Sequence, residues 1–419
     1  MDFKHLPSEP FTLRNVSIPA CLVDAQAGLV LTDIGIAEGV FCEPAGVDVD
    51  MSGAMVLPAF VDMHTHLDKG HTLPRASNPD GSFIGALNAV REDHAHWTAT
   101  DVYRRADFAL RCAYAHGTRA IRTHIDSAAP QDLISWSALA ELRAAWAGRI
   151  DIQGVCLNVC DDIDLDGRFQ TTADLVRQND GVLGLVPYPM HGLDSLLRDF
   201  LSLAARLDLD VDMHVDETMD PTVESLRNVC QAVIDIGFDR TVTVGHVCSL
   251  SAQKYDRAMD TLDLVARAGV HVVSLPMCNM YLQDRQDSRT PRRRGVTLVH
   301  EMKQRGIPVS FASDNTRDPF YAYGDLDMIE VVQQATRIAH LDHSDEDWFR
   351  AFSSVPAATC GFTPVSFANG APADLIVCRS RNWGEFHARP QSDRIVIRNG
   401  QVIDRTLPDY AELDDLFES

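Results

Sequence analysis

The feature that most constrains the fold is an alternation between short apolar runs and longer amphipathic stretches, repeated through most of the chain. Eight short runs rich in β-branched residues occupy 56–66, 118–126, 150–159, 182–190, 209–217, 241–247, 270–276 and 307–314. Alternation of this kind predicts βαβ units that build a parallel sheet. Eight strands with helical crossovers match an α/β fold of the (β/α)8, or TIM barrel, type.

The stretches between the runs carry helical spacing. Between residues 135 and 146, the apolar residues Leu139, Leu142 and Trp146 are separated by steps of three and four, which places them on one helical face. Residues 101–116 and 223–236 are also predicted to be helical. A doubly wound open sheet is the alternative, but we find no Gly-rich phosphate loop of the kind such sheets use.

The two ends of the chain carry a different pattern. Residues 11–55 contain short strand-like segments such as LVLTDIGIAEG, and residues 373–405 contain ADLIVCR and DRIVIRNGQVID with an Asn-Gly turn signal. We expect residues 1–57 and 366–419 to pair into one small β domain beside a barrel formed by residues 58–365. The acidic tail YAELDDLFES predicts a solvated terminus or a short surface helix.

The net charge limits the classes of molecule that the protein is expected to bind. With 37 Lys and Arg against 60 Asp and Glu, the chain has a formal net charge of −23. This field repels phosphate backbones and anionic membrane surfaces. We therefore expect a small neutral or cationic molecule as the partner, and neither nucleic acid nor membrane.

The location of the protein is predicted from three further features. No apolar stretch reaches the roughly 18 residues of a membrane span, and the first residues lack the apolar core of a secretion signal. The ten cysteines are scattered and form no C-x-x-C pair. We expect a cytoplasmic protein with reduced thiols.

Polar residues gather where the apolar runs end, which is the face on which barrels build active sites. Alternate residues of a strand point to the same side, so the two imidazoles of H-x-H at the end of the first run face one point. Each polar residue alone is also explained by a bonded core histidine or a helix-capping aspartate, but their agreement in strand order favours a site. The residues are His64, His66, His214, Glu217, His246 and Asp314.

These residue types suit a hydrolytic metal centre. His64, His66, His214 and Asp314 supply three imidazoles and one carboxylate to one divalent ion, either zinc or iron. Such an ion lowers the pKa of a water molecule to near ~7. The fourth run, VLGLVPYPM, contains no Lys that would bridge two ions, so we expect a single metal.

The remaining polar residues supply proton transfer. We expect Glu217 to act as general acid and base, His246 to orient the hydroxide or the substrate, and Asp314 to accept a proton from the attacking water. His124, in the motif RTHID, either lines the pocket or packs behind it. Lys69, which follows the paired histidines, either contacts the substrate, forms an ion pair or lies in a solvated loop.

The motifs taken together resemble the amidohydrolase superfamily, and in particular its bacterial cytosine deaminase branch. The resemblance extends over nearly the whole chain, through PAFVDMHTHLDK, RTHID, HVDE, VTVGHV, NMYLQDR, PRRRGVTLVHEM, SDNTRDPFYAYGDLDM and ADLIVC. It implies a mononuclear iron or zinc site and a small β-sandwich made from the two chain ends. The family's metal ligands match His64, His66, His214 and Asp314. Its proton shuttle matches Glu217, and its histidine after strand six matches His246.

The resemblance also concerns the substrate. Cytosine deaminases carry an aromatic residue beside the substrate, and Phe320 stands at the matching position. They also carry a Gln after strand three that binds the pyrimidine amide edge, where this chain has Val159 with Asn158 beside it. We take Asn158 and Phe320 as candidate substrate contacts. A site without the Gln discriminates cytosine poorly, which favours a cytosine-like or related N-heterocycle.

Three functions stay open. The first is an aminohydrolase that releases ammonia from an N-heterocycle. The second is a hydrolase of a cyclic amide or of a substituted amine on such a ring, which uses the same ligands. The third is a non-catalytic barrel that binds a small molecule, against which the metal ligands and proton shuttle argue. Large barrels often associate through their outer helices, so a homo-oligomer also stays open.

Overall fold

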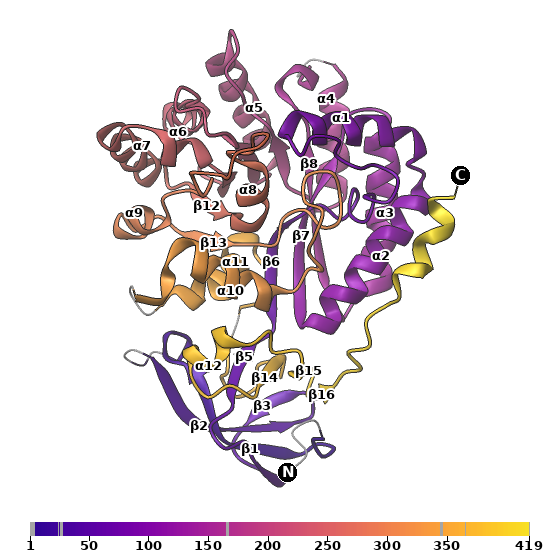
Figure 1. Cartoon of the computed structure of the whole chain (residues 1–419), viewed down its shortest axis with the longest axis vertical. Coiled ribbons are helices and arrows are strands. Elements are labelled where there is room, and N and C mark those ends of the chain that lie inside the picture. Colours follow the sequence, from indigo (N-terminus) through magenta and orange to yellow (C-terminus); the bar gives the residue numbers. More distant parts are fainter. Residues whose placement is uncertain are drawn as a thin grey trace.

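The computed structural model describes residues 5–23, 25, 28–164, 167–343, 347–364 and 366–418. Figure 1 shows two units arranged along the long axis of the molecule. One is a set of parallel strands flanked by helices, which we call the parallel array. The other, built from both ends of the chain, is a mainly antiparallel sheet that we call the terminal sheet.

The parallel array has eight strands in two hydrogen-bonded groups, ordered β6-β7-β8 and β13-β12-β11-β10-β9, and every pairing is parallel. The strands are β6 (Phe60–Thr65), β7 (Thr118–Asp126), β8 (Asp151–Leu157), β9 (Leu183–Leu185), β10 (Val211–Val215), β11 (Val242–His246), β12 (His271–Ser274) and β13 (Val309–Phe311).

Backbone contacts join the two groups at both edges. The amide of Asp314, just after β13, donates to the carbonyl of His64 on β6 at 2.9 Å. At the other edge, the amide of Val182, just before β9, donates to the carbonyl of Gly154 on β8 at 2.9 Å. The carboxyl ends of β6, β10, β11 and β13 are therefore held on one side of the array.

Helices connect the strands and cover the outside of the array (Figure 1). They are α1 (Phe83–Asp93), α2 (Ala99–His116), α3 (Gln131–Trp146), α4 (Arg168–Gln178), α5 (Leu193–Leu207), α6 (Ser225–Ile236), α7 (Tyr255–Ala268), α8 (Pro276–Leu282), α9 (Val299–Gln304), α10 (Met328–Ala339) and α11 (Ser354–Cys360). A further helix, α12 (Trp383–Ala388), lies between strands of the terminal sheet in sequence. The predicted face of α3 is confirmed, since Leu139, Leu142 and Trp146 are all buried.

Local signals set the bounds of α2. The hydroxyl of Thr98 accepts a hydrogen bond from the amide of Asp101 and caps the first turn. The helix ends at Gly117, whose φ of +102° lies in the left-handed region that glycine adopts without strain. A Cβ at Gly117 would lie 2.5 Å from Cδ1 of Ile376, so glycine also permits the terminal sheet to approach.

The terminal sheet has eight strands, in the order β16-β15-β14-β5-β1-β2-β3, with β4 paired alongside β1. Its strands are β1 (Phe11–Pro19), β2 (Leu29–Ala37), β3 (Val40–Cys42), β4 (Val47–Asp50), β5 (Met55–Pro58), β14 (Leu375–Cys378), β15 (Ile395–Arg398) and β16 (Gln401–Val402). The two ends of the chain meet where β5 pairs with β14.

Both faces of β5 are buried, because the strand lies between two cores. Met55 and Leu57 pack with the core of the parallel array, whereas Val56 packs with the separate core of the terminal sheet. The predicted strand over 56–66 is therefore two strands: β5 ends at Pro58 and β6 begins at Phe60. Sequence periodicity does not place this break, because residues 56–61, on both sides of it, are all apolar.

Other predicted elements differ in length. The run at 182–190 forms a strand only over Leu183–Leu185, since Pro187 and Pro189 have no amide hydrogen to donate to a neighbouring strand. All ten cysteines lie in the described residues and are free thiols. Among the described helices, none combines the length and apolar character that crossing a membrane requires.

Candidate active site

Four side chains from three strand ends converge on one point. Nε2 of His214 lies 3.1 Å from Nε2 of His64 and 3.2 Å from Nε2 of His66. Oδ1 of Asp314 lies 3.3 Å from Nε2 of His66 and 3.6 Å from Nε2 of His64. The structure therefore brings together all four predicted metal ligands, although about 250 residues separate the first from the last.

The separations fit a metal ion. Ligand atoms held about 2.0–2.2 Å from one tetrahedral ion lie about 3.3–3.6 Å from each other, close to the distances between these four atoms. Both carboxylate oxygens of Asp314 are buried and have no hydrogen-bond partner among the described residues. Buried carboxylates are ordinarily paired or bound to a cation.

Protonation in the cluster also suits a cation. Burial lowers the pKa of His64, His66 and His214 well below the usual value, so the imidazoles are neutral, which is the form that binds a metal. Burial, together with the charge of Asp314, raises the pKa of Glu217 well above its usual value. The two carboxyl groups thus lie in a buried place where their charged forms are disfavoured without a bound cation.

Two of the ligands are held by contacts specific to their strands. Asp62 on β6 accepts hydrogen bonds from the amide of Ser313 at 3.0 Å and from its hydroxyl, which fixes the residue before Asp314. A Cβ on Gly245 would lie 2.9 Å from Cε1 of His64, so β11 needs glycine at this point. Asp314 itself has a φ of +67°, an uncommon conformation outside glycine that often marks functional sites.

The predicted proton-transfer residues lie beside the ligands and share a partner. Nδ2 of Asn279 donates to Nδ1 of His246 at 2.9 Å and to Oε1 of Glu217 at 3.2 Å. Since Nδ1 of His246 accepts this bond, its ring proton is on Nε2, which is buried and has no partner among the described residues. Burial lowers the pKa of His246 to about 3 and keeps the ring neutral.

The sequence did not single out Asn279. It lies on α8, after β12, where it begins the motif NMYLQDR. A nearby residue of the same helix end, Gln283, donates its Nε2 to the backbone carbonyl of Glu217 at 3.2 Å. A lone amide on a helix is a weak sequence signal, and only the hydrogen bonds from Asn279 to Glu217 and His246, at the ends of β10 and β11, reveal its position in the site.

The two predicted substrate contacts do not join the cluster of four ligands. Asn158 follows β8, is 4% exposed and has a buried Oδ1 without a hydrogen-bond partner among the described residues. Phe320 follows β13, is partly buried, and packs against Phe83 with ring centroids 5.4 Å apart. Neither forms a hydrogen bond or ring contact with the four converging ligands within the part of the chain that the structure describes.

The alternatives for Lys69 and His124 are resolved in part. Lys69 is buried and its Nζ lies 2.6 Å from Oδ1 of Asp126, so it forms the ion pair, and it also lies 6.0 Å from the ring centroid of Phe320. His124 is fully buried, with its ring 4.1 Å from that of His64 and 4.5 Å from that of His214. It packs against two of the predicted ligands, and both of its ring nitrogens are buried without a hydrogen-bond partner among the described residues.

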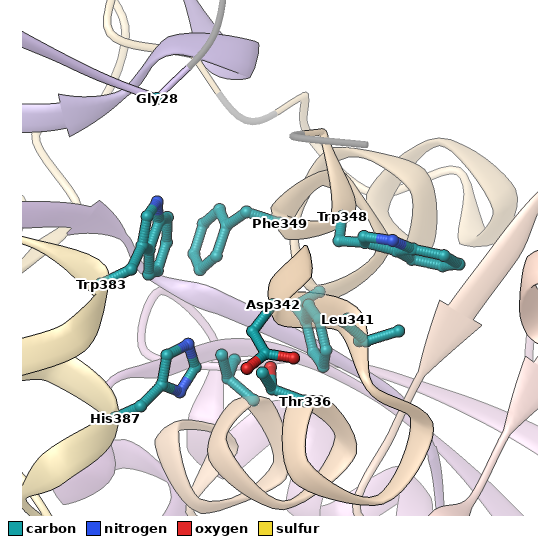
Figure 2. Close-up of a pocket in the computed structure, with 10 residues that line it drawn as sticks. Gly28, Thr336, Leu341, Asp342, Trp348, Phe349, Trp383 and His387 are labelled. Carbon is teal, nitrogen blue, oxygen red and sulfur yellow. The ribbon is translucent and has the colours of Figure 1, made fainter. Parts of the chain in front are cut away.

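A separate cavity of about 280 Å³ lies away from this cluster (Figure 2). Trp348, Phe349 and Trp383 supply aromatic walls, and the carboxylate of Asp342 lies near the imidazole of His387. None of the predicted site residues lines it. The predicted site residues therefore lie at the carboxyl ends of the parallel strands and outside this cavity.

Comparisons with known proteins identify the family. The amidohydrolase family model matches residues 104–404, more than half of the chain. A pterin deaminase of Rhizobium rhizogenes is 49% identical over an alignment that covers 96% of each chain. An N-isopropylammelide isopropyl amidohydrolase of a Pseudomonas species is 25% identical over 85% of this chain and 87% of its own.

A solved structure supports the fold. The 5-methylcytosine deaminase of Klebsiella pneumoniae with 5-fluorocytosine superposes with a TM-score of 0.79, at 24% identity, over 96% of this chain and 98% of its own. The predicted superfamily is confirmed by the family model and by the relative at 49% identity. This chain belongs to the amidohydrolase family and is a hydrolase that acts on carbon–nitrogen bonds.

Proposed function

We propose that the protein is a metal-dependent aminohydrolase that removes the exocyclic amine of a pterin-class heterocycle as ammonia. The observation that carries this proposal is the 49% identity to a pterin deaminase over 96% of each chain, combined with the buried His–Asp cluster. One divalent ion, zinc or iron, is held by His64, His66, His214 and Asp314. The orphan carboxylate of Asp314 and the 3.1–3.6 Å separations support this assignment.

The chain's own residues carry the proton transfers. When bound, the ion supplies Lewis acidity and lowers the pKa of a water molecule to near ~7. Asp314 accepts the proton of the attacking water. Glu217, whose pKa is raised, donates its proton to a ring nitrogen. Asp314 then passes the proton taken from the water to the departing amine, and Glu217 regains a proton from the hydroxyl group of the adduct as the carbonyl forms and ammonia leaves. His246 donates from Nε2 to the oxygen that adds to the ring carbon, because Asn279 occupies its Nδ1.

The proposed substrate fits the presence of Val159 where cytosine deaminases have a Gln. Cytosine deaminases place a Gln at that position, whereas this chain offers the shorter amide of Asn158, whose Oδ1 is buried without a partner among the described residues. A pterin presents a ring N–H and an amine beside the carbon that is attacked. Asn158 accepts from such an N–H, and Phe320 packs against a ring face. Both substrate contacts are proposals.

A second candidate is favoured by one observation. The relative that is an N-isopropylammelide isopropyl amidohydrolase is 25% identical over most of both chains, and its name describes release of a substituted amine. The same ligands and the same shuttle serve that reaction, since only the leaving amine differs. Hydrolysis of isopropylammelide is therefore the direct competitor of pterin deamination.

The architecture around the site is part of the proposal. We propose that the parallel array closes into a (β/α)8 barrel over residues 58–365, supported by the hydrogen bonds at both edges of its two strand groups. Residues 1–57 and 366–402 form the small β domain around the second apolar core, whereas the rest of the predicted segment 366–419 leaves this domain and lies along the array. The ten free thiols support a cytoplasmic location, and the net charge of −23 opposes nucleic acid as a partner.

The test measures product release by purified protein of known metal content. We expect ammonia from pterin, with a higher kcat/KM than from cytosine, and no isopropylamine from N-isopropylammelide. Isopropylamine as the dominant product would establish the second candidate. Failure of all three substrates with one metal ion bound per chain would contradict both.

A further inference from the structure

The acidic tail, expected to be a solvated terminus or a short surface helix, is docked along the parallel array. After β16 the chain leaves the terminal sheet, runs beside the array, and forms a 3-10 helix over Tyr410–Leu416 that lies against α2 (Figure 1, yellow). We call residues 403–418 the C-terminal strap. It connects the terminal sheet with the side of the array that carries the loops after β6 and β13.

Charge and apolar contacts fix the strap to α2. Arg104 forms two hydrogen bonds with the carboxylate of Asp415, at 2.6 and 2.7 Å, and Arg111 pairs with Glu412 at 2.7 Å. Beneath these pairs, Leu413 is 4% exposed and packs with Phe108 of α2. The acidic residues of the tail therefore match basic residues on one face of a helix.

Tyr410 extends from the strap onto the loops that follow β6 and β13. Its ring stacks on Phe108 with centroids 5.5 Å apart, and the guanidinium of Arg317 lies 4.2 Å from its centroid. Its hydroxyl donates to Oδ1 of Asp325 at 3.3 Å. The ring of His71 lies 6.2 Å away. One side chain thus contacts α2, the loop after β6 and, at two points, the loop after β13.

The same two loops carry two of the proposed metal ligands. His66 precedes His71 by five residues, and Asp314 precedes Arg317 by three. The loops are bonded to each other beneath Tyr410, since the amide of His71 donates to the carbonyl of Thr316 at 3.0 Å. His71, Asp314 and Arg317 all have positive φ values, a conformation that surrounding contacts must hold.

We infer that Tyr410, held by the C-terminal strap, is a positioning residue that keeps the loops after β6 and β13 in register and so sets Asp314 against His66. This inference rests on the proposed metal site. It goes beyond it by assigning a role to a residue that touches neither metal nor substrate, and that lies about 100 residues from the nearest ligand in sequence. The strap makes the geometry of the site depend on the far end of the chain.

The test compares metal affinity in full-length variants. Zn²⁺ is removed by chelation, and its dissociation constant is measured by competition with a chromophoric chelator. We expect Tyr410→Ala to raise this constant about tenfold or more, the scale seen when residues behind metal ligands are removed. Tyr410→Phe keeps the ring contacts and should rescue affinity to within about threefold. Tyr255→Ala, at a tyrosine that is 69% exposed on α7, is the matched control and should leave it unchanged.

A second variant covers the case in which Tyr410→Ala does not fold. Leu413→Asp places a charge in the contact with α2 and should release the strap without altering a side chain that touches either loop. Release is monitored by limited proteolysis near residues 403–409. A released strap with wild-type Zn²⁺ affinity would overturn the inference. A wild-type protein that binds no metal would instead overturn the proposed function, so the two failures are distinguishable.

Discussion

The carboxyl end of the parallel array and the core of the terminal sheet are equally buried, yet they are built from opposite residue types. The terminal sheet buries apolar side chains such as Leu13, Leu375 and Ile397. The array buries His64 and Asp314, whose polar atoms include several with no hydrogen-bond partner among the described residues.

The difference separates stability from function. Burying apolar side chains stabilises the terminal sheet, at roughly 1.5–3 kcal/mol for each large side chain. An unpaired buried polar atom destabilises a fold by about 1–3 kcal/mol. A cluster of such atoms at one end of the array is therefore not explained by folding, and it marks where a ligand completes the structure.

The largest expected effect comes from removing the proton shuttle. Glu217→Gln should lower kcat by about 10²–10⁴, the range for loss of a general acid–base group. Metal content should stay at the wild-type level, because Glu217 is not one of the converging ligands. Glu141→Gln, at an exposed position on α3, is the control. A loss smaller than tenfold with metal bound would show that the shuttle lies elsewhere.

A smaller effect is expected from crowding a ligand from behind. Gly245→Ala places a methyl group 2.9 Å from Cε1 of His64 and should displace that imidazole. We expect Zn²⁺ affinity to fall by about 10–100-fold, measured by chelator competition. Gly384→Ala, on α12 with only one contact at 3.3 Å, should bind Zn²⁺ normally. Equal affinities in both variants would mean that His64 is not held from this side.

A modest effect is expected at the proposed substrate amide. Asn158→Ala removes one hydrogen bond to the substrate, worth about 0.5–1.5 kcal/mol, and should lower kcat/KM by roughly two- to tenfold. The change should appear mainly in KM, because the residue lies outside the proton-transfer group. Steady-state kinetics with pterin measures it, with Asn228→Ala on α6 as the control. An unchanged KM would remove Asn158 from the substrate site.

The smallest effect on turnover is expected in the terminal sheet, where the effect on stability is large. Leu375→Ala leaves a cavity in the apolar core and should lower the free energy of unfolding by about 2–5 kcal/mol. Below the unfolding transition, kcat and metal content should match the wild type. Chemical denaturation and steady-state assays measure the two quantities. Loss of metal together with the loss of stability would show that the metal site depends on the packing of the terminal sheet.

Sequence reasoning recovered the α/β class and the family, but it misplaced the first strand boundary. Periodicity identifies apolar runs, and residues 56–61 are all apolar, so it does not place the division between β5, which ends at Pro58, and β6, which begins at Phe60. The tail forms the short surface helix that was one of the two expectations, but its docking was not predictable, because its acidic residues pair with Arg104 and Arg111, about 300 residues away in the chain.

What the sequence determined by itself is the type and order of the polar side chains at the strand ends. His64 and His66 stand two residues apart on one strand, and His246 and Asp314 each follow a buried run, so local periodicity alone places them at one end of a parallel set. Only the tertiary structure decided that their atoms meet within 3.1–3.6 Å, that Asn279 bridges His246 and Glu217, and that Tyr410 lies over the ligand-bearing loops. Periodicity acts over a few residues, whereas these contacts depend on how segments hundreds of residues apart pack against each other.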